Sequence, residues 1–258
     1  MKSVRRGIRV SGFLALTPTM LAAWSAHDAL TRKDRSALRD RWFGAWCDAM
    51  LRVFGIRVIT IGERPTRGAK LVVSNHRGVA DVLVLLRTFG GHMVSRADLA
   101  KWPLIGLAGR RLGTVFVDRS DAKSGAVTIR AMRNLLNQGE TVTIFPEGTT
   151  FSGDEVRPFH AGGFVAAAGT SAAIVPVGLA YSRDSQAAFG DETFVEHLGK
   201  MAGAPPSFVV VSIGEPLTLP AKSREAAERA REAVAKEVAA ARREADRREL
   251  EGGALERE

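Results

Sequence analysis

A histidine and an aspartate, His76 and Asp81, stand five positions apart directly after a short apolar run. The run, residues 71–73, is typical of a buried strand, and the polar residues after it mark the strand's end. Five residues of α-helix turn the chain by roughly 500°, so the two side chains cannot share one face of a continuous helix. They can meet if His76 lies in the loop after the strand and Asp81 begins the next helix, residues 81–86.

In that arrangement the pair has the chemistry of a general base. Asp81 would accept a hydrogen bond from one imidazole nitrogen of His76 and fix its tautomer, while the other nitrogen would face a cleft. A helix N-terminus next to a solvated histidine would give the same spacing. The pair alone therefore leaves both interpretations open.

A second stretch, residues 141–150, has the same design. A strand runs into a Pro-Glu-Gly turn that leaves Glu147 at its end. In open α/β sheets, ligands bind beyond the carboxyl ends of the strands. We therefore predict that His76, Asp81 and Glu147 contribute to one shared site.

Four ordered motifs now make the sequence recognisable. They are Asn75-His76 through Asp81, residues 113–119 ending in Arg119, the Phe-Pro-Glu-Gly-Thr run at 145–149, and Ile-Val-Pro-Val at 174–177. In order and spacing the chain resembles the PlsC-like glycerophospholipid (lysophospholipid, or 1-acyl-glycerol-3-phosphate) acyltransferases over about residues 50–215.

The resemblance implies transfer of a fatty acyl group from acyl-CoA or acyl-carrier protein to the free hydroxyl of a lysophospholipid. His76 would be the general base and Asp81 would orient it, with no covalent acyl-enzyme, and we expect neither side chain to fill a core. The leading acceptor is 1-acyl-sn-glycerol 3-phosphate, which would give phosphatidic acid. The alternatives are another lyso-lipid, such as lyso-ornithine lipid or a zwitterionic lysophospholipid, and a non-catalytic membrane-binding protein.

Further site residues follow from the same motifs. Arg119 is the candidate for bidentate binding of a phosphate, and Lys101 is a second cation. Glu147 and Gly148 would orient the acceptor. The complete substrate-binding set is Asn75, Lys101, Arg119, Glu147, Gly148 and Thr149, with Pro176 on the acyl-donor side. We expect no metal, since His76 and Asp81 lack a third ligand, and no cofactor besides the acyl thioester.

Two positions depart from the family pattern. Many members that acylate lysophosphatidic acid have an arginine directly after the Phe-Pro-Glu-Gly-Thr run, where this chain has Thr150. A basic residue common in a later Pro-Phe-Lys stretch is His160 here. Both changes remove cationic character from the acceptor side and put a phosphomonoester acceptor in question.

Positive charge is concentrated at the N-terminus. The formal net charge is +9, and residues 1–57 hold eleven Lys or Arg against four Asp. Nucleic acid is not the expected partner, because the segment has no helix-turn-helix, zinc-finger or RNP-like pattern. Its aromatic residues instead indicate an anionic membrane surface; they are Trp24, Trp42, Phe43, Trp46 and Phe54. The single Cys47 excludes an internal disulfide.

Two N-terminal helices are expected. Residues 10–26 carry no charge but are diluted by polar residues, so an interfacial or re-entrant helix fits first, a single span second and a cleaved signal third. Residues 36–54 are amphipathic. Their periodicity fits a core-facing and a membrane-facing helix equally, and their aromatic and arginine content favours membrane contact. Basic residues on both sides of residues 10–26 place the protein at the cytoplasmic face of an inner membrane.

We predict an α/β fold in which a central mixed sheet is flanked by helices, preceded by a membrane-docking helical segment. The domains would be residues 1–55 (docking helices), 56–220 (catalytic) and 221–258 (a charged helix and tail). Residues 101–106 are expected to form a turn and residues 182–206 a connection without clear periodicity. Strands are expected at 56–61, 71–73, 113–119, 141–145, 173–181 and 208–213, with a short run at 92–95, and further helices at 121–138, 161–169 and 221–250.

Overall fold

The computed structural model describes residues 2–31, 35–111, 113–118, 121–190, 192–218 and 222–255. The strands in these ranges are β1 (Ile56–Ile61), β2 (Lys70–Ser74), β3 (His92–Arg96), β4 (Val115–Val117), β5 (Thr141–Ile144), β6 (Ala173–Tyr181) and β7 (Ser207–Ile213). The α-helices are α1 (Lys2–Leu30), α2 (Arg35–Phe54), α3 (Val79–Phe89), α4 (Pro103–Arg111), α5 (Ala122–Asn137), α6 (Gly162–Ala167), α7 (Phe194–Gly203) and α8 (Ser223–Leu255). A 3-10 helix, η1 (Ala97–Lys101), precedes α4.

The strands form one sheet in the order β1-β7-β6-β2-β5-β3-β4. The neighbours from β6 to β4 are parallel. Strand β7 is antiparallel to β6, and β1 is parallel to β7. The predicted mixed α/β sheet is therefore confirmed.

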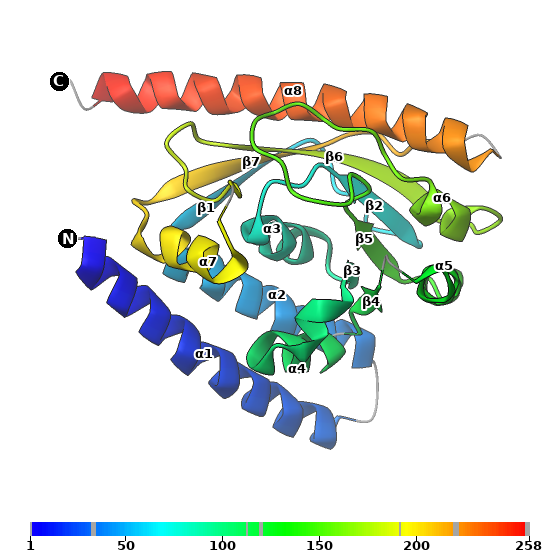
Figure 1. Cartoon of the computed structure of the whole chain (residues 1–258), viewed down its shortest axis with the longest axis horizontal. Helices are drawn as coiled ribbons and strands as arrows, with labels where there is room; N and C mark the ends of the chain where they lie inside the picture. The colour runs from blue at the N-terminus through cyan, green and yellow to red at the C-terminus, as the bar shows by residue number, and fades with distance from the viewer. Residues whose placement is uncertain are drawn as a thin grey trace.

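Helices cover both faces of the sheet (Figure 1). Side chains alternate between the faces of a strand. On β2, Val72 accordingly packs with α2 and α3, whereas Leu71 and Val73 pack with α5, α6 and α8. In Figure 1, α8 runs along one side of the sheet, and α1 lies outside α2 on the other.

The apolar face of α2 belongs to the core. Cys47, Met50 and Leu51 are at most 2% exposed, and Phe43 stacks on Trp46 against the same cluster. Burial raises the pKa of the Cys47 thiol above its ordinary value. Of the two interpretations of this helix, the core-facing one is therefore correct, and its aromatic content reflects packing.

Helix α1 lies along α2 and α7 and is attached by a buried arginine. Arg9 donates hydrogen bonds to the carbonyl oxygens of Met201 (3.2 Å) and Ala204 (2.7 Å), at the end of α7. Among the described residues, no helix has both the length and the hydropathy to cross a membrane.

Two local expectations were wrong. Residues 101–106 form the end of η1 and the start of α4 in place of a turn. The stretch 182–206 contains α7, which begins with a capping box: Thr193 Oγ1 accepts from the Glu196 N–H, and Glu196 Oε2 accepts from the Thr193 N–H at 2.8 Å. The Thr-x-x-Glu spacing was the available signal for this helix.

The Arg9 attachment makes a prediction about stability. Replacing Arg9 with Met should lower the free energy of unfolding by about 1.5–3 kcal/mol, because two hydrogen bonds from a charged donor are lost. Urea unfolding at constant pH measures this. Arg41→Met, at an exposed arginine of α2, is the matched control, with an expected change within about 0.5 kcal/mol. Equal losses in both variants would contradict an anchoring role for Arg9.

Candidate active site

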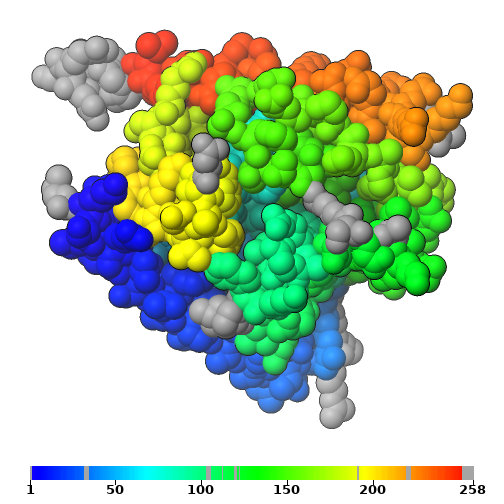
Figure 2. All heavy atoms as spheres, viewed as in Figure 1, coloured from blue at the N-terminus to red at the C-terminus, as the bar shows by residue number. Residues whose placement is uncertain are grey.

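The motif residues gather where two neighbouring parallel strands end. His76 follows β2, Asp81 lies in the first turn of α3, and Glu147 follows β5, which pairs with β2. Figure 2 shows a hollow in the surface between α7 (yellow), the loop after β5 (green) and the segment of η1 and α4 (blue-green). The predicted shared site thus lies at the carboxyl ends of two central strands of the sheet.

His76 and Asp81 meet as their spacing predicts. His76 Nδ1 lies 2.8 Å from Asp81 Oδ2, and the imidazole stacks on Phe145 with ring centroids 3.9 Å apart. The aspartate side chain is fully buried, whereas 20% of the histidine side chain is exposed. Because an ionised carboxylate only accepts, the proton of the neutral imidazole is on Nδ1. Nε2 is then the basic nitrogen.

Asp81 is held by three further donors. Its Oδ2 accepts from the backbone N–H groups of Arg77 (2.5 Å) and Gly78 (2.8 Å), and its Oδ1 accepts from the Tyr181 hydroxyl (2.7 Å). Burial raises the pKa of Asp81, but the hydrogen bonds and the charge of His76 outweigh this effect, so the net pKa lies below its ordinary value. Asp81 therefore stays ionised, and at the helix N-terminus its charge is also stabilised by the α3 dipole.

Tyr181 was not anticipated from the sequence. It ends β6, next to the strand that leads to His76, and is buried. Burial and the Asp81 charge raise its pKa well above the ordinary value, so its hydroxyl remains a donor. Only its place at a strand end hinted at this role.

Glu147 supports the loop after β2, residues 75–78, from within the protein; this loop carries His76 and is the candidate catalytic loop. Its side chain has no exposed area; Oε2 accepts from the His76 N–H (2.8 Å) and from Arg77 Nη1 (3.1 Å). Its Oε1 accepts from the Arg157 N–H at 3.1 Å. Both oxygens are therefore occupied by protein groups, and we replace the expected acceptor-orienting role of Glu147 with that of a brace for His76.

Asn75 is also internal. Its amide donates to the Leu179 carbonyl (3.0 Å) and accepts from the Leu179 N–H (2.8 Å), which joins the end of β2 to β6. With no exposed area, it is reassigned from substrate binding to structure. Pro176 is buried within β6, in register with Val73 of β2.

The other expected binding residues differ in exposure. Thr149 is exposed, and Gly148, with a φ of 85°, adopts a conformation that favours glycine. Lys101 ends η1 with an exposed side chain. Arg119 lies outside the described residues.

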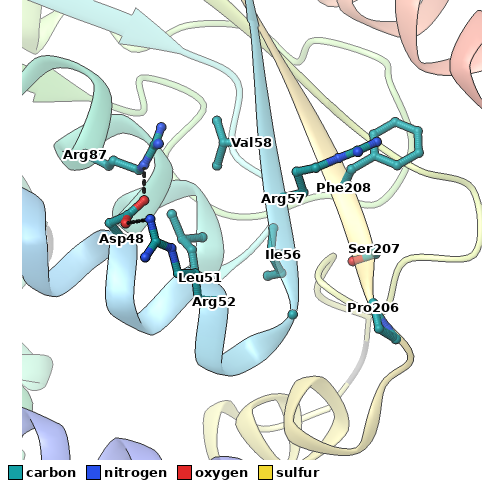
Figure 3. A pocket seen from close by; sticks show the side chains of 11 residues that line it. Asp48, Leu51, Arg52, Ile56, Arg57, Val58, Arg87, Pro206, Ser207 and Phe208 are labelled. Carbon is teal, nitrogen blue, oxygen red and sulfur yellow. Dashed lines mark hydrogen bonds and ion pairs between the residues drawn. The ribbon is translucent and has the colours of Figure 1, made fainter.

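Two shallow hollows lie away from this site, at the edge strand β1. One, of about 560 Å³, is lined by β1, β7 and α2, and the other, of about 570 Å³, adjoins it. Figure 3 shows Asp48 of the first hollow between Arg52 and Arg87, at 2.6 and 2.7 Å. Neither hollow includes the dyad.

In the described part of the chain, no cluster of three His, Cys, Asp or Glu side chains is arranged to hold a metal.

Comparison with known proteins places these features in a family. The family model described as Acyltransferase matches residues 55–180. The chain is 32% identical to the lyso-ornithine lipid O-acyltransferase of Pseudomonas aeruginosa, over 90% of this chain and 91% of that protein. The chain belongs to the acyltransferase family.

Other relatives of this acyltransferase are named for a different acceptor. The 1-acyl-sn-glycerol-3-phosphate acyltransferase of Neisseria gonorrhoeae is 31% identical over 43% of this chain and 44% of its own. The crystal structure of the 1-acyl-sn-glycerophosphate acyltransferase PlsC from Thermotoga maritima has the same fold. It matches with a TM-score of 0.74 and 20% identity over 92% of this chain and 96% of that one. The predicted resemblance to PlsC-like acyltransferases is confirmed.

The dyad geometry predicts the effect of removing either member. His76→Ala and Asp81→Asn should each lower kcat by about two orders of magnitude or more, because the base is lost or its tautomer is no longer fixed. The initial rate of thioester-dependent acyl transfer measures this. Folded variants with near-normal rates would exclude the dyad as the catalytic pair.

The two variants should differ in stability. Since Asp81 is fully buried and accepts four hydrogen bonds, the expectation that it fills no core was wrong. Asp81→Asn should therefore lower the melting temperature more than His76→Ala does, and each rate is to be compared at a temperature where the variant is folded.

Proposed function

We propose that this acyltransferase moves a fatty acyl group from acyl-CoA or acyl-carrier protein to the hydroxyl of a lyso-lipid, with His76 as general base. The observation that carries the proposal is a partly exposed histidine whose tautomer is set by a buried, ionised aspartate. When the imidazole is neutral, its proton is on Nδ1, and Nε2 can accept a proton as a general base requires.

The reaction proceeds by direct transfer. Nε2 of His76 removes the proton of the acceptor hydroxyl as its oxygen bonds to the thioester carbonyl carbon. Asp81 stabilises the imidazolium that forms and remains ionised itself. The tetrahedral intermediate collapses with cleavage of the carbon–sulfur bond, and the imidazolium returns its proton to the departing thiolate.

We propose a lyso-ornithine lipid as the acceptor. The headgroup of such a lipid carries one carboxylate and one ammonium in place of a phosphate. The relative that matches nearly the whole chain is named for this acceptor, whereas the N. gonorrhoeae relative named for the glycerol phosphate matches less than half of it. Thr150 stands where many lysophosphatidic acid enzymes have an arginine.

The positively charged side chains at and beside the loop after β5 fit an acceptor whose headgroup has a singly charged acidic group. This loop is bound to the catalytic loop through the hydrogen bond from the Phe151 N–H to the His76 carbonyl. Arg157, with 46% of its side chain exposed, lies over the Phe151 ring at 5.1 Å. Arg77 is committed to Glu147 in a buried ion pair. Arg157 Nη2 also lies 3.4 Å from Glu155 Oε2, so its charge is partly neutralised, and it suits a carboxylate better than a phosphomonoester, which carries nearly two charges.

A panel of acceptors tests this choice. With labelled acyl-CoA, lyso-ornithine lipid should give a kcat/KM at least about ten-fold above that of 1-acyl-sn-glycerol 3-phosphate, the equivalent of one lost charged hydrogen bond. Thr150→Arg should lower KM for the phosphate acceptor by supplying a second cation. A wild-type preference for 1-acyl-sn-glycerol 3-phosphate that collapses in Arg119→Ala would establish our second candidate, phosphatidic acid synthesis.

We also propose that α1 docks the enzyme on the cytoplasmic face of a membrane. Five of the nine exposed large apolar side chains among the described residues lie on α1: Val4, Ile8, Val10, Leu14 and Leu30. Lys2, Arg5 and Arg6 lie at the start of the same helix. A helix with exposed apolar side chains and a basic end fits an interfacial position on anionic lipid.

Substitution on α1 tests the docking. The double variant Ile8→Asp/Leu14→Asp should lower the partition coefficient for phosphatidylglycerol vesicles by about ten-fold or more, since each apolar side chain contributes about 1.5–3 kcal/mol when buried. Val127→Asp, at a 61% exposed valine of α5, is the control. Removal of residues 1–54 would also remove core side chains of α2, so point variants are preferable. Unchanged sedimentation of the double variant would place the docking surface elsewhere.

A further inference from the structure

A second histidine–carboxylate pair lies beside the dyad. His197 of α7 is fully buried, and its Nδ1 is 2.9 Å from Glu192 Oε1. Lys200 donates to the same oxygen at 3.0 Å. The His197 ring stacks on Phe189 with centroids 3.8 Å apart and planes at 12°. As in the dyad, a carboxylate five positions away and an aromatic ring fix one imidazole.

The second pair differs from the dyad in the surroundings of the other ring nitrogen, His197 Nε2. Burial lowers the pKa of His197 and outweighs the raising effect of Glu192, so the ring is neutral with its proton on Nδ1. Nε2 is buried and has no hydrogen-bond partner in the described structure. A base that no substrate can reach has no direct part in proton transfer, so the significance of His197 lies in what it touches.

His197 and its stacking partner touch the catalytic loop. A Cβ on Gly78 would lie 3.3 Å from His197 Nε2 and 2.0 Å from the Ala187 carbonyl oxygen. The Phe189 N–H donates to the Arg77 carbonyl at 2.7 Å. Residues 187–189, on which the His197 ring packs, therefore contact the same two residues whose N–H groups hold Asp81.

We propose that His197 is a positioning residue for the His76–Asp81 dyad. Its ring, oriented by Glu192, clamps Phe189 against Arg77 and closes the space beside Gly78. The backbone N–H groups of Arg77 and Gly78 are then held in place, and they in turn hold Asp81 Oδ2 at the position of its hydrogen bond to His76. This role rests on the proposed function, because it concerns the rate at which His76 acts as a base.

The expected result is a loss in kcat with little change in substrate binding. His197→Ala should lower kcat about ten-fold or more, because small displacements of a catalytic group reduce the rate steeply. KM for acyl-CoA and for the lyso-lipid should stay within about two-fold, as neither substrate touches His197. His197→Phe keeps the ring and the stack and should recover most of kcat.

His92→Ala is the matched control for a general loss of stability. His92 is 6% exposed and is bonded to the Gly113 carbonyl (2.8 Å) and to Arg39 (2.9 Å), on a different part of the sheet. This variant should lower the melting temperature as His197→Ala does but leave kcat nearly unchanged. If both alanine variants lose kcat equally, or if His197→Ala changes KM in place of kcat, the positioning role is overturned.

A second pair of variants tests the same contact without removing a core side chain. Gly78→Ala must displace residues 187–189 and should lower kcat as His197→Ala does. Gly125→Ala on α5 is its control, because a Cβ there meets nothing within 4 Å. Wild-type kcat in Gly78→Ala would overturn the proposal. A failure of the proposed function is distinct, since it would show as activity in His76→Ala.

Discussion

The structure around the active site depends on one buried charge. An ionised carboxylate without exposed area is strongly destabilising unless it is paired and fully hydrogen bonded. Asp81, in the first turn of α3, meets this condition with four donors from two other segments: the loop after β2 and the end of β6. The loop conformation, the first turn of α3 and the packing of β6 beside β2 are thus required by the same group that sets the histidine tautomer.

The sequence predicted the features that depend on local pattern. An apolar strand followed by His76 and Asp81, and a second strand ended by Glu147, suffice to place a site at a sheet edge. The partners of these side chains are far apart in sequence and could not be predicted. Glu147 accepts from a backbone N–H that lies 71 positions away in the sequence, and Asn75 bonds to a peptide group 104 positions away. Tyr181 donates to Asp81 across 100 positions. No periodicity encodes such pairings. For this reason the sequence alone places Asn75 and Glu147 in substrate binding.

The N-terminal helices show a related limit. The three- and four-residue spacing of apolar residues in α2 defines a buried face but not what buries it, and the aromatic content suggested lipid where the structure has a protein core. Helix α1 has two faces, one on α2 and α7 and one exposed. Arg9 joins it to the end of α7, the helix that also carries His197. A single ten-residue helix therefore separates the proposed docking surface from the catalytic loop.

The chain contains one tyrosine, and it is the one bonded to Asp81. Incorporation of tyrosine that is isotope-labelled only at the ring carbon bearing the hydroxyl would therefore give a single magnetic resonance signal that needs no assignment. Because the hydroxyl on this carbon donates to the carboxylate that holds His76, the chemical shift of the carbon responds to the charge on the histidine. The state of the dyad can thus be followed in the intact enzyme, without a reporter group added to the site.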